Sequence, residues 1–423
     1  MKKIGVALLG VGTVGGGTYT ILKSMRETFK EKYQLDIEVL HVIDKNLERV
    51  KELGIDPKIV STDINNVVNN QNIHIVCEFF GGIEPAKSFS IAALKAGKSV
   101  VTANKEMFAK NWIELESAAK EGNAGLYFEA TSVGGVPIVR VLNESMQGNE
   151  ILSIQGIFNG TTNFILSKMI DEGLEYKDVL KEAQELGYAE ADPTADVEGY
   201  DSMYKLSILS TLAFGRKVPI EKIYREGITK INKIDIEYGK KFGYTLKLLA
   251  TAQMIDGKLE ARVHPTFVGN NNPLASVKGS FNAVLLKGNN VGEIMLYGRG
   301  AGALPTGSAI VSDIIYAAQQ IKHKLIGFSE NKFFDDDSFA KDFSCEYFIR
   351  MNVVDKPGVL AKITKVFGEN NVSINSMEQT AHGGTASLIF MIHKTPESLM
   401  KKSIDQMKNI DVINSIDAVI RVM

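Results

Sequence analysis

Cysteine is scarce in this sequence, with only Cys77 and Cys345 among 423 residues. The two lie far apart and form no CxxC pair, which excludes a disulfide scaffold and a cysteine metal cage. An excess of positive charge is also missing, because 48 Lys and Arg stand against 50 Asp and Glu. Without basic residues to displace counterions, nucleic acid is not an expected partner. The scarcity of cysteine favours a reducing, cytoplasmic location.

A membrane segment is not expected either. Residues 4–22 carry no charge and follow Lys2 and Lys3, as in a signal peptide or membrane span. However, six glycines and three threonines interrupt the stretch, and no A-x-A cleavage site follows. A chain of this length, 44% hydrophobic and 23% charged, is instead expected to fold into two or three domains.

The same N-terminal stretch is typical of a strand, a tight turn and a helix. Residues 4–9 form a short apolar run, and Gly10, Gly12 and Gly15 follow in G-x-G-x-x-G spacing. A helix is expected from Thr13 to about residue 33. In this motif glycines permit the turn and the close approach of a pyrophosphate, which lies at the helix N-terminus. We therefore expect Gly10, Gly12, Thr13, Val14 and Gly15 to contact a dinucleotide.

A second strand, residues 37–43, ends at Asp44, whose carboxylate can accept hydrogen bonds from the adenosine ribose. Asp44 favours NAD, whereas the neighbouring Lys45 can receive the additional phosphate of NADP. The sequence leaves the choice between NAD and NADP open.

Further strands and helices alternate along the chain. Residues 73–79, 99–102 and 126–128 are short apolar strands, and residues 85–96 are a helix. Such alternation predicts an α/β fold with a parallel, doubly wound Rossmann sheet over residues 1–129, in which ligands bind beyond the carboxyl ends of the strands. Lys105 follows one such end. It either reaches the nicotinamide or is a solvated residue at a helix start, and its position alone does not decide between these roles.

Residues 187–201 hold five acidic side chains, and a helix follows. An acidic loop is by itself usually solvated surface. Here Asp201 and Lys205 are four residues apart on a helix with apolar neighbours, so they share one face and are expected to be partly buried. An ammonium held in a cleft by a carboxylate can exchange a proton with a carbonyl or alcohol oxygen.

Several motifs together resemble the homoserine dehydrogenase family. They are the glycine fingerprint, the Thr-Ala-Asn-Lys run ending at Lys105, the Asn-Gly-Thr-Thr-Asn run from Asn159, the Gly-Tyr-Ala-Glu-Ala-Asp-Pro loop from Gly187, and Asp201 with Lys205. The resemblance covers residues 1–324. It implies an NAD(P)-dependent oxidoreductase that interconverts L-homoserine and L-aspartate 4-semialdehyde in threonine, methionine and isoleucine biosynthesis. It also implies a homodimer or homotetramer, and an α+β catalytic and dimerisation domain over residues 130–326.

The resemblance implies a role for each matching residue. Lys205 is the proton donor and Lys105 lies beside nicotinamide and substrate. The remaining residues are implied as binding groups: Glu190, Asp196 and Asp201 for homoserine, Gly187 and Gly302 for the cofactor, and Glu129, Ser132, Gly134 and Val136 for a sodium ion, mostly through carbonyls.

Two other classes of protein share part of these features. A different semialdehyde dehydrogenase needs a cysteine nucleophile, whereas Cys77 lies within an apolar strand, where a thiol is usually inert. A non-catalytic sensor of NAD(P) and amino acids has no need of Lys105, Glu190, Asp201 and Lys205 together.

The C-terminal part is expected to form a separate domain. Residues 327–344 are polar and predict a linker, and residues 345–423 follow a β-α-β-β-α-β pattern. Asp355 is expected to cap the first helix of this pattern. The ferredoxin-like pattern resembles an ACT domain, and residues 355–360 match the signature turn of that domain. The resemblance implies regulation by an amino acid such as threonine, and assembly without a ligand is the alternative.

Overall fold

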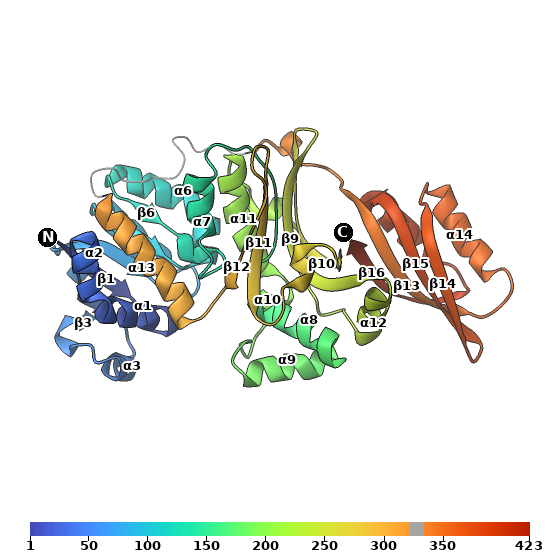
Figure 1. The fold of residues 1–423 in the computed structure, drawn as a ribbon, viewed down its shortest axis with the longest axis horizontal. Helices are drawn as coiled ribbons and strands as arrows, with labels where there is room; N and C mark the ends of the chain where they lie inside the picture. Colours follow the sequence, from blue (N-terminus) through green and yellow to red (C-terminus); the bar gives the residue numbers. More distant parts are fainter. Residues whose placement is uncertain (321–333) are drawn as a thin grey trace. The chain divides into compact units, whose positions relative to one another are not determined.

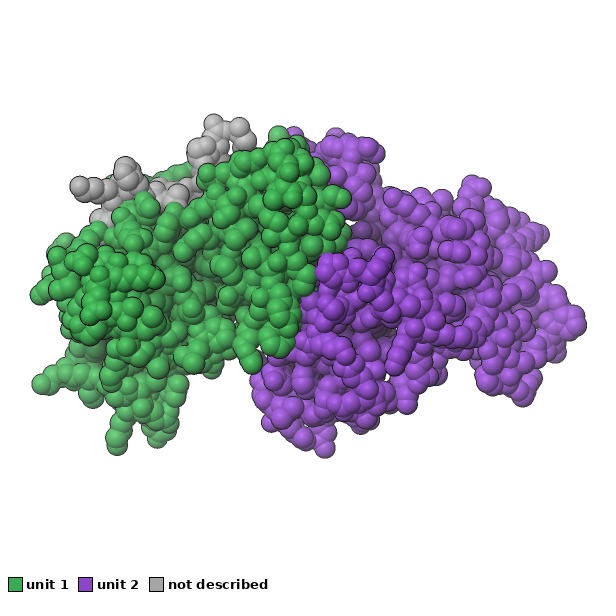
Figure 2. All heavy atoms as spheres, in the orientation of Figure 1, with its two compact units in different colours: residues 1–160, 201–223, 281–334 green, residues 161–200, 224–280, 335–423 purple. Residues whose placement is uncertain are grey.

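The structure is a computed structural model, which describes residues 1–320 and 334–423. The chain divides into two compact units, shown in Figure 2. Unit 1 comprises residues 1–160, 201–223 and 281–334, and unit 2 comprises residues 161–200, 224–280 and 335–423. Each unit is discontinuous in sequence, so the contiguous domain boundaries expected above remain a prediction. Residues 327–333 of the expected linker lie outside the described residues.

Unit 1 contains a six-stranded parallel sheet in the order β3-β2-β1-β4-β5-β6. The strands are β1 (Lys2–Leu9), β2 (Leu35–Ile43), β3 (Val60–Ser61), β4 (Ile73–Glu78), β5 (Ser99–Thr102) and β6 (Leu126–Tyr127). The intervening helices are α3 (Leu47–Glu52), α4 (Asn65–Val68), α5 (Ala86–Lys95) and α6 (Lys105–Glu121). This is the predicted doubly wound sheet, whose short apolar strands are buried because helices cover its faces.

The first predicted helix is two helices, α1 (Thr13–Ser24) and α2 (Arg26–Tyr33), because the backbone leaves helical geometry at Met25. A distant helix, α13 (Ala303–Gln319), packs beside α1 and contributes Ile310 and Ile314 to the core of this sheet (Figure 1). The two helices meet closely at glycines. A Cβ on Gly17 would stand 2.2 Å from the carbonyl oxygen of Ala303.

Unit 1 also holds a small antiparallel sheet in the order β12-β11-β7. Its strands are β7 (Ile151–Ile157), β11 (Phe281–Gly288) and β12 (Gly292–Arg299). Short helical segments precede β7: Glu129–Thr131, α7 (Ile138–Arg140) and a π-helical turn, Val141–Ser145. Helix α11 (Tyr200–Phe214) carries Asp201 and Lys205.

The sheet of unit 2 has the order β9-β10-β16-β13-β15-β14, and β8 (Tyr224–Arg225) pairs with β10. Its strands are β9 (Tyr244–Ile255), β10 (Lys258–Gly269), β13 (Ser344–Val354), β14 (Ile374–His382), β15 (Thr385–Pro396) and β16 (Ile413–Val422). Its helices are α8 (Gly160–Glu172), α9 (Tyr176–Glu185), α10 (Thr194–Val197), α12 (Lys233–Lys241), α14 (Val359–Glu369) and α15 (Glu397–Met407). The last strand, β16, runs parallel to β10 and antiparallel to β13, so one sheet joins both parts of the unit.

The C-terminal module, residues 344–423, has the predicted β-α-β-β-α-β order in β13, α14, β14, β15, α15 and β16. The expectation that Asp355 caps its first helix is wrong. Helix α14 begins at Val359 after Gly358, which has a left-handed φ of 85°, while the N–H of Asp355 donates to the carbonyl of Gly384. Glycine adopts this φ without the steric cost of a Cβ, which sets the helix start three residues later.

Among residues 1–320 and 334–423, no helix combines the length and hydropathy that crossing a bilayer requires. The uncharged stretch at residues 4–22 is strand β1 followed by most of α1.

Candidate active site

Asp201 lies between two lysines in unit 1. Its Oδ1 is 2.9 Å from Nζ of Lys105, and its Oδ2 is 2.7 Å from Nζ of Lys205. The side-chain amide of Asn159 donates to the same Oδ2 at 2.9 Å. Asp201 and Lys205 are buried, whereas the side chain of Lys105 is 41% exposed. The carboxylate of Asp201 therefore contacts the partly exposed ammonium group of Lys105 and the buried ammonium group of Lys205.

Local structure explains these positions. Residues four apart on a helix face the same way, which brings Asp201 and Lys205 of α11 together. Lys205 also donates to the carbonyl oxygen of Phe158 at 2.7 Å, just after β7. Lys105 is the first residue of α6, and the side chain of Asn104 accepts from the N–H of Met107 to cap that helix. Two helix starts thus direct Lys105 and Asp201 toward each other.

The electrostatics of the cluster favour an ionised Asp201. Burial alone would raise the pKa of this carboxyl, but the nearby charges of Lys105 and Lys205, with hydrogen bonds from Asn159 and Lys205, hold its pKa well below the usual range. The carboxylate of Asp201 thus holds two ammonium groups close together. Such a site can stabilise negative charge that develops on a substrate oxygen and can protonate it.

The glycine fingerprint forms the expected turn. Gly10 has a φ of 98°, which favours glycine, and a Cβ on Gly15 would lie 2.1 Å from the carbonyl oxygen of Gly10. A Cβ on Gly12 would meet no atom within 4 Å, so open space lies above the backbone there. Thr13 and Val14 form the first turn of α1. These features fit a pyrophosphate at the helix N-terminus.

Asp44 is bound to the same turn. Its Oδ2 accepts from the N–H of Val11 at 2.7 Å, and its Oδ1 accepts from the N–H of Asn46 at 2.8 Å. Lys45 is exposed beside it. Arg49, which the sequence analysis did not single out, reaches the carbonyl of Val11 at 3.4 Å and pairs with a glutamate of its own helix. Both a carboxylate and cations are therefore present where the adenosine ribose is expected.

Sequence analysis also missed Glu78, a fully buried residue at the carboxyl end of β4. Its carboxyl accepts from the N–H of Phe80 and from the hydroxyl of Thr102, each at 2.6 Å. Burial raises the pKa of Glu78 to about 7, although these hydrogen bonds lower it. The signal was an acidic residue at the end of an otherwise apolar strand. Glu78 holds the segment Thr102 to Asn104 that leads into Lys105.

The acidic loop that precedes Asp201, residues 187–200, belongs to unit 2 and is called the substrate loop below. Gly187 has a φ of 76° after α9, Glu190 is exposed, and Asp196 lies in α10. The loop is fixed at Tyr188, whose ring stacks on Phe164 with centroids 4.5 Å apart and whose carbonyl accepts from Thr161 at 2.6 Å. The loop therefore presents acidic side chains from a fixed backbone. Gly302, the other predicted cofactor contact, has a φ of 121° at the start of α13 in unit 1.

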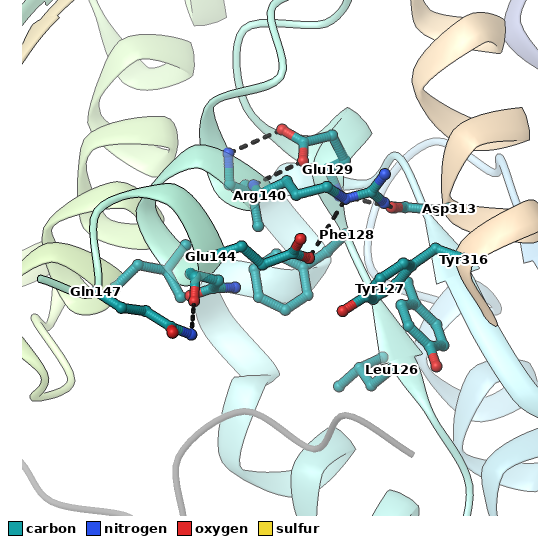
Figure 3. A pocket seen from close by; sticks show the side chains of 12 residues that line it. Leu126, Tyr127, Phe128, Glu129, Arg140, Glu144, Gln147, Asp313 and Tyr316 are labelled. Atoms are coloured by element: carbon teal, nitrogen blue, oxygen red, sulfur yellow. Dashed lines mark hydrogen bonds and ion pairs between the residues drawn. The ribbon is translucent and has the colours of Figure 1, made fainter. Parts of the chain in front are cut away.

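Glu129, one of the residues of the expected sodium site, belongs to a buried charge cluster that Figure 3 shows. The carboxyl of Glu129 accepts from the N–H groups of Val139 and Arg140, and Asp313 binds both the N–H of Glu129 and the guanidinium of Arg140. Burial raises the pKa of Glu129 to about 7 and that of Asp313 to about 6. The guanidinium of Arg140 pairs with Asp313 and Glu144, whereas the carboxyl of Glu129 accepts from backbone N–H groups, so a cation or a proton could compensate the charge of Glu129.

The backbone beside this cluster also fits a monovalent cation. Val133 and Gly134 have φ values of 36° and 50°, and the hydroxyl of Ser132 is buried without a hydrogen-bond partner among the described residues. Carbonyls of Ser132, Gly134 and Val136 can supply oxygen ligands. Over the described part of the chain, no group of three or more His, Cys, Asp or Glu side chains is arranged to hold a metal, so the ligands here would be mainly carbonyls.

Cys77 is fully buried in β4, and burial raises the pKa of its thiol well above the ordinary value. A thiol that does not ionise is a poor nucleophile, which disfavours the alternative semialdehyde dehydrogenase.

Comparisons with known proteins agree along the whole chain. Residues 10–129 match the homoserine dehydrogenase NAD-binding domain, residues 137–315 match homoserine dehydrogenase, and residues 347–412 match the ACT domain. The homoserine dehydrogenase of Bacillus subtilis is 37% identical over 100% of this chain and 99% of its own, and that of Corynebacterium glutamicum is 39% identical over 99% and 95%.

Solved structures give the same result. A homoserine dehydrogenase from Thiobacillus denitrificans is 38% identical, covers 100% of this chain and 99% of its own, and superposes with a TM-score of 0.92. A hyperthermophilic archaeal homoserine dehydrogenase in complex with NADPH is 30% identical, covers 75% of this chain and 98% of its own, and gives a TM-score of 0.65. The chain, an oxidoreductase with a nicotinamide-cofactor domain and a C-terminal ACT domain, therefore belongs to the homoserine dehydrogenase family.

Proposed function

We propose that this protein oxidises L-homoserine to L-aspartate 4-semialdehyde and catalyses the reverse reduction, with NAD or NADP. The observation that carries the proposal is the placement of Asp201 between Lys105 and Lys205, at 2.9 and 2.7 Å. A bound nicotinamide would supply or accept the hydride. The protein must then manage the charge and the proton on one substrate oxygen, which is the chemistry that a fixed pair of ammonium groups performs.

We assign the proton transfer to Lys205. In the reduction, its Nζ–H donates to the oxygen of the semialdehyde as the hydride reaches the carbon, and in the oxidation the neutral amine takes the proton back. Asp201 and the carbonyl of Phe158 orient that amine through hydrogen bonds of 2.7 Å. Lys105, which is more exposed, is placed to contact the cofactor and the substrate.

The substrate loop supplies the remaining recognition. Glu190 is exposed and carries the carboxylate that the α-ammonium of homoserine requires, and Asp196 contributes a second negative charge. Asp201 was also expected to bind homoserine. Its three bonds to Lys105, Lys205 and Asn159 favour the role of orienting the two lysines.

We infer a sodium ion near Glu129, bound mainly by carbonyls of Ser132, Gly134 and Val136. The burial of the carboxyls of Glu129 and Asp313 and the positive φ values at Val133 and Gly134 support this site, because a cation beside two buried carboxyls would stabilise their ionised forms. If the site is occupied in solution, thermal stability should be higher in NaCl than in tetramethylammonium chloride at equal ionic strength.

We further infer regulation by threonine through the ACT domain, a homodimer or homotetramer, and a cytoplasmic location. The order of domains supports regulation, since the ACT match follows the catalytic match. Assembly is supported by β12 and β14, each of which ends its sheet among the described strands and so offers an edge for pairing. The scarcity of cysteine supports the location.

One assay tests the central proposal. Purified protein is supplied with L-homoserine and either NAD or NADP, and formation of reduced cofactor is followed by absorbance. We expect activity with at least one cofactor, and the ratio of the two kcat/KM values assigns the preference. L-serine, one methylene shorter, is the matched control and should react far more slowly. Absence of homoserine oxidation with both cofactors would refute the proposed function.

A further inference from the structure

A buried ionic junction joins the C-terminal module to the rest of unit 2. Arg421, near the end of β16, is only 4% exposed. Its guanidinium binds Glu397 of α15 at 2.6 and 3.2 Å, the hydroxyl of Tyr224 at 2.7 Å, and the carboxylate of Glu226. Tyr347 donates to Glu397 at 2.8 Å. Two carboxylates thus compensate one buried cation, and they come from opposite sides of the junction.

The backbone makes the junction continuous. Arg421 of β16 stands opposite Thr266 of β10 in a parallel pair, and opposite Tyr347 of β13 in an antiparallel pair. The N–H of Glu226 donates to the carbonyl of Val263 at 2.8 Å, next to the pairing of β8 with β10. A movement of β16 is therefore transmitted to Glu226 both through side-chain ion pairs and through the sheet.

The segment 224–229 then contacts the end of the substrate loop, residues 197–200. The N–H of Ile228 donates to the carbonyl of Val197 at 2.8 Å, and the hydroxyl of Thr229 donates to the carboxylate of Glu198 at 2.8 Å. The guanidinium of Arg225 donates to the carbonyl of Glu198 and lies 3.6 Å from the ring centroid of Tyr200. Side chains on both sides of Glu226 thus fix the loop end.

Gly227 packs closely against residues 197–198 at this contact. A Cβ on Gly227 would stand 2.5 Å from the carbonyl oxygen of Val197 and 2.6 Å from the Cα of Glu198. Close-packed contacts transmit displacement, because neighbouring atoms cannot absorb it. On its other side the junction borders a cavity of about 350 Å³, lined by Met400, Lys401 and Val419 among others, which leaves room for the guanidinium to rearrange.

We propose that Arg421, Glu226 and Tyr224 are positioning residues. Arg421 of the C-terminal module holds segment 224–229 through Tyr224 and Glu226, and that segment holds residues 197–200. The position of residues 197–200 in turn sets how the preceding loop binds homoserine. The inference rests on the proposed function, in which Glu190 and Asp196 of that loop bind homoserine. It specifies the route by which the state of the ACT domain reaches the substrate site: α15 and β16, then Glu226, then Glu198. Regulation requires such a differential contact between states.

The test uses the full-length chain with Glu226→Gln, which removes the charge from a residue whose side chain is 35% exposed and keeps its shape. Asp411→Asn is the matched control, since Asp411 pairs with Lys362 on the surface of the same module at 2.8 Å. We expect Glu226→Gln to raise the KM for homoserine about three- to tenfold, with kcat and the cofactor KM changed less than about twofold. The control should change none of these constants.

Two further variants separate positioning from simple loss of stability. Tyr224→Phe removes one hydroxyl from the junction and should shift the homoserine KM in the same direction by a smaller factor. Glu198→Gln should raise it as well, and combining it with Glu226→Gln should give less than the product of the two factors, because both act through segment 224–229.

Equal changes in the KM values for homoserine and cofactor, or a lowered melting temperature with unchanged KM, would overturn the positioning role. Multiplicative effects in the double variant would overturn the route through Glu198. A wild-type chain that does not oxidise homoserine would instead refute the proposed function, so the two failures are distinguishable.

Discussion

The protonation state of a buried acid in this protein depends on the groups that surround its carboxyl. Asp201 stays ionised because two ammonium groups lie within 3 Å of its carboxylate. Glu78 instead accepts hydrogen bonds from the neutral groups of Phe80 and Thr102, and burial raises its pKa to about 7. Both are buried acids, Glu78 at the end of strand β4 and Asp201 in the first turn of helix α11. Their contrasting protonation states lead to separate predictions on catalysis and on the pH dependence of stability.

Replacing Lys205 by alanine should lower kcat by about 100-fold or more, because the proton donor is lost. The dissociation constant of NADPH, measured by its fluorescence, should change little. Lys181→Ala is the control, since Lys181 is 79% exposed on α9. A folded Lys205→Ala variant with near-normal turnover would remove Lys205 from this role.

Replacing Glu190 by glutamine should raise the homoserine KM more than the cofactor KM, because the α-ammonium loses its counter-charge. Glu185→Gln, an exposed neighbour at the end of α9, serves as the control. Steady-state kinetics with each substrate varied in turn provide the measurement. Equal effects on both constants would indicate that Glu190 maintains the loop and does not bind homoserine.

Glu78 predicts a pH dependence of stability. Its folded pKa of about 7 lies above the ordinary 4.5, so its stabilising contribution is complete below about pH 4.5 and is lost as pH rises through 7. The full change amounts to about 3 kcal/mol. Glu78→Gln imitates the protonated acid and lacks this loss. The free energy of unfolding of the variant, relative to wild type, should therefore increase from pH 5 to pH 8.

Urea unfolding of wild type and variant at both pH values measures this difference. Trp112, the single tryptophan, lies in α6 of unit 1 and reports on the unit that contains Glu78. Glu121→Gln, on the exposed end of the same helix, is the control. A difference that does not vary with pH would show that Glu78 is ionised throughout.

At the scale of elements, glycines do two distinct tasks on one helix. Gly12 precedes α1 with open space above it, and Gly17 lies where α1 meets α13. The first position leaves room for a ligand, and the second allows two helices to approach. The sequence motif does not distinguish these tasks, because both residues belong to one glycine-rich run.

Alanine substitutions separate the two tasks. Gly17→Ala should lower the free energy of unfolding by about 1–3 kcal/mol, because its Cβ would stand 2.2 Å from a backbone oxygen. Gly12→Ala should change stability by less than about 0.5 kcal/mol and weaken NADPH binding. Urea unfolding and NADPH fluorescence titration of both variants provide the measurements. A stability loss at Gly12 equal to that at Gly17 would contradict the assignment.

At the scale of the whole molecule, the C-terminal module is part of unit 2 and shares its sheet. Strand β16 pairs with β10, and Arg350 of β13 binds Asp235 of α12, which is fully buried, at 2.7 Å. Deleting the module would leave Asp235 without its cation, which is strongly destabilising. Regulation is therefore better tested by point substitutions than by truncation.

Asp355→Ala provides such a substitution. Asp355 is exposed just before α14, within residues 355–360 that resemble the ACT signature, so its loss should leave the fold intact. We expect threonine to inhibit homoserine oxidation by the wild type and to inhibit the variant at higher concentration or not at all. Asp405→Ala, another exposed acid of the module, should retain inhibition. If threonine affects none of these proteins, the proposal of regulation by threonine fails.

The sequence determined what depends on neighbours along the chain. Apolar runs placed β1, β4 and β5 within a residue or two, and the spacing of four placed Asp201 and Lys205 on one face of α11. The C-terminal strand and helix order was likewise predicted, as was the family from its motifs. Local periodicity suffices for these features, because helix and strand repeats are set by nearest neighbours. The sequence analysis did not identify the strands β9 to β12.

Only the tertiary structure decided which distant segments meet. It placed Lys105 at Asp201, 96 positions later in the chain, packed α13 into the core of the N-terminal sheet, and set β16 beside β10. It also placed the N-cap of α14 at Gly358 in place of Asp355, and it buried Glu78. Such contacts depend on sheet order and long-range packing, which no repeat within a short window encodes. The active cluster and the ionic junction both arise from contacts of this kind.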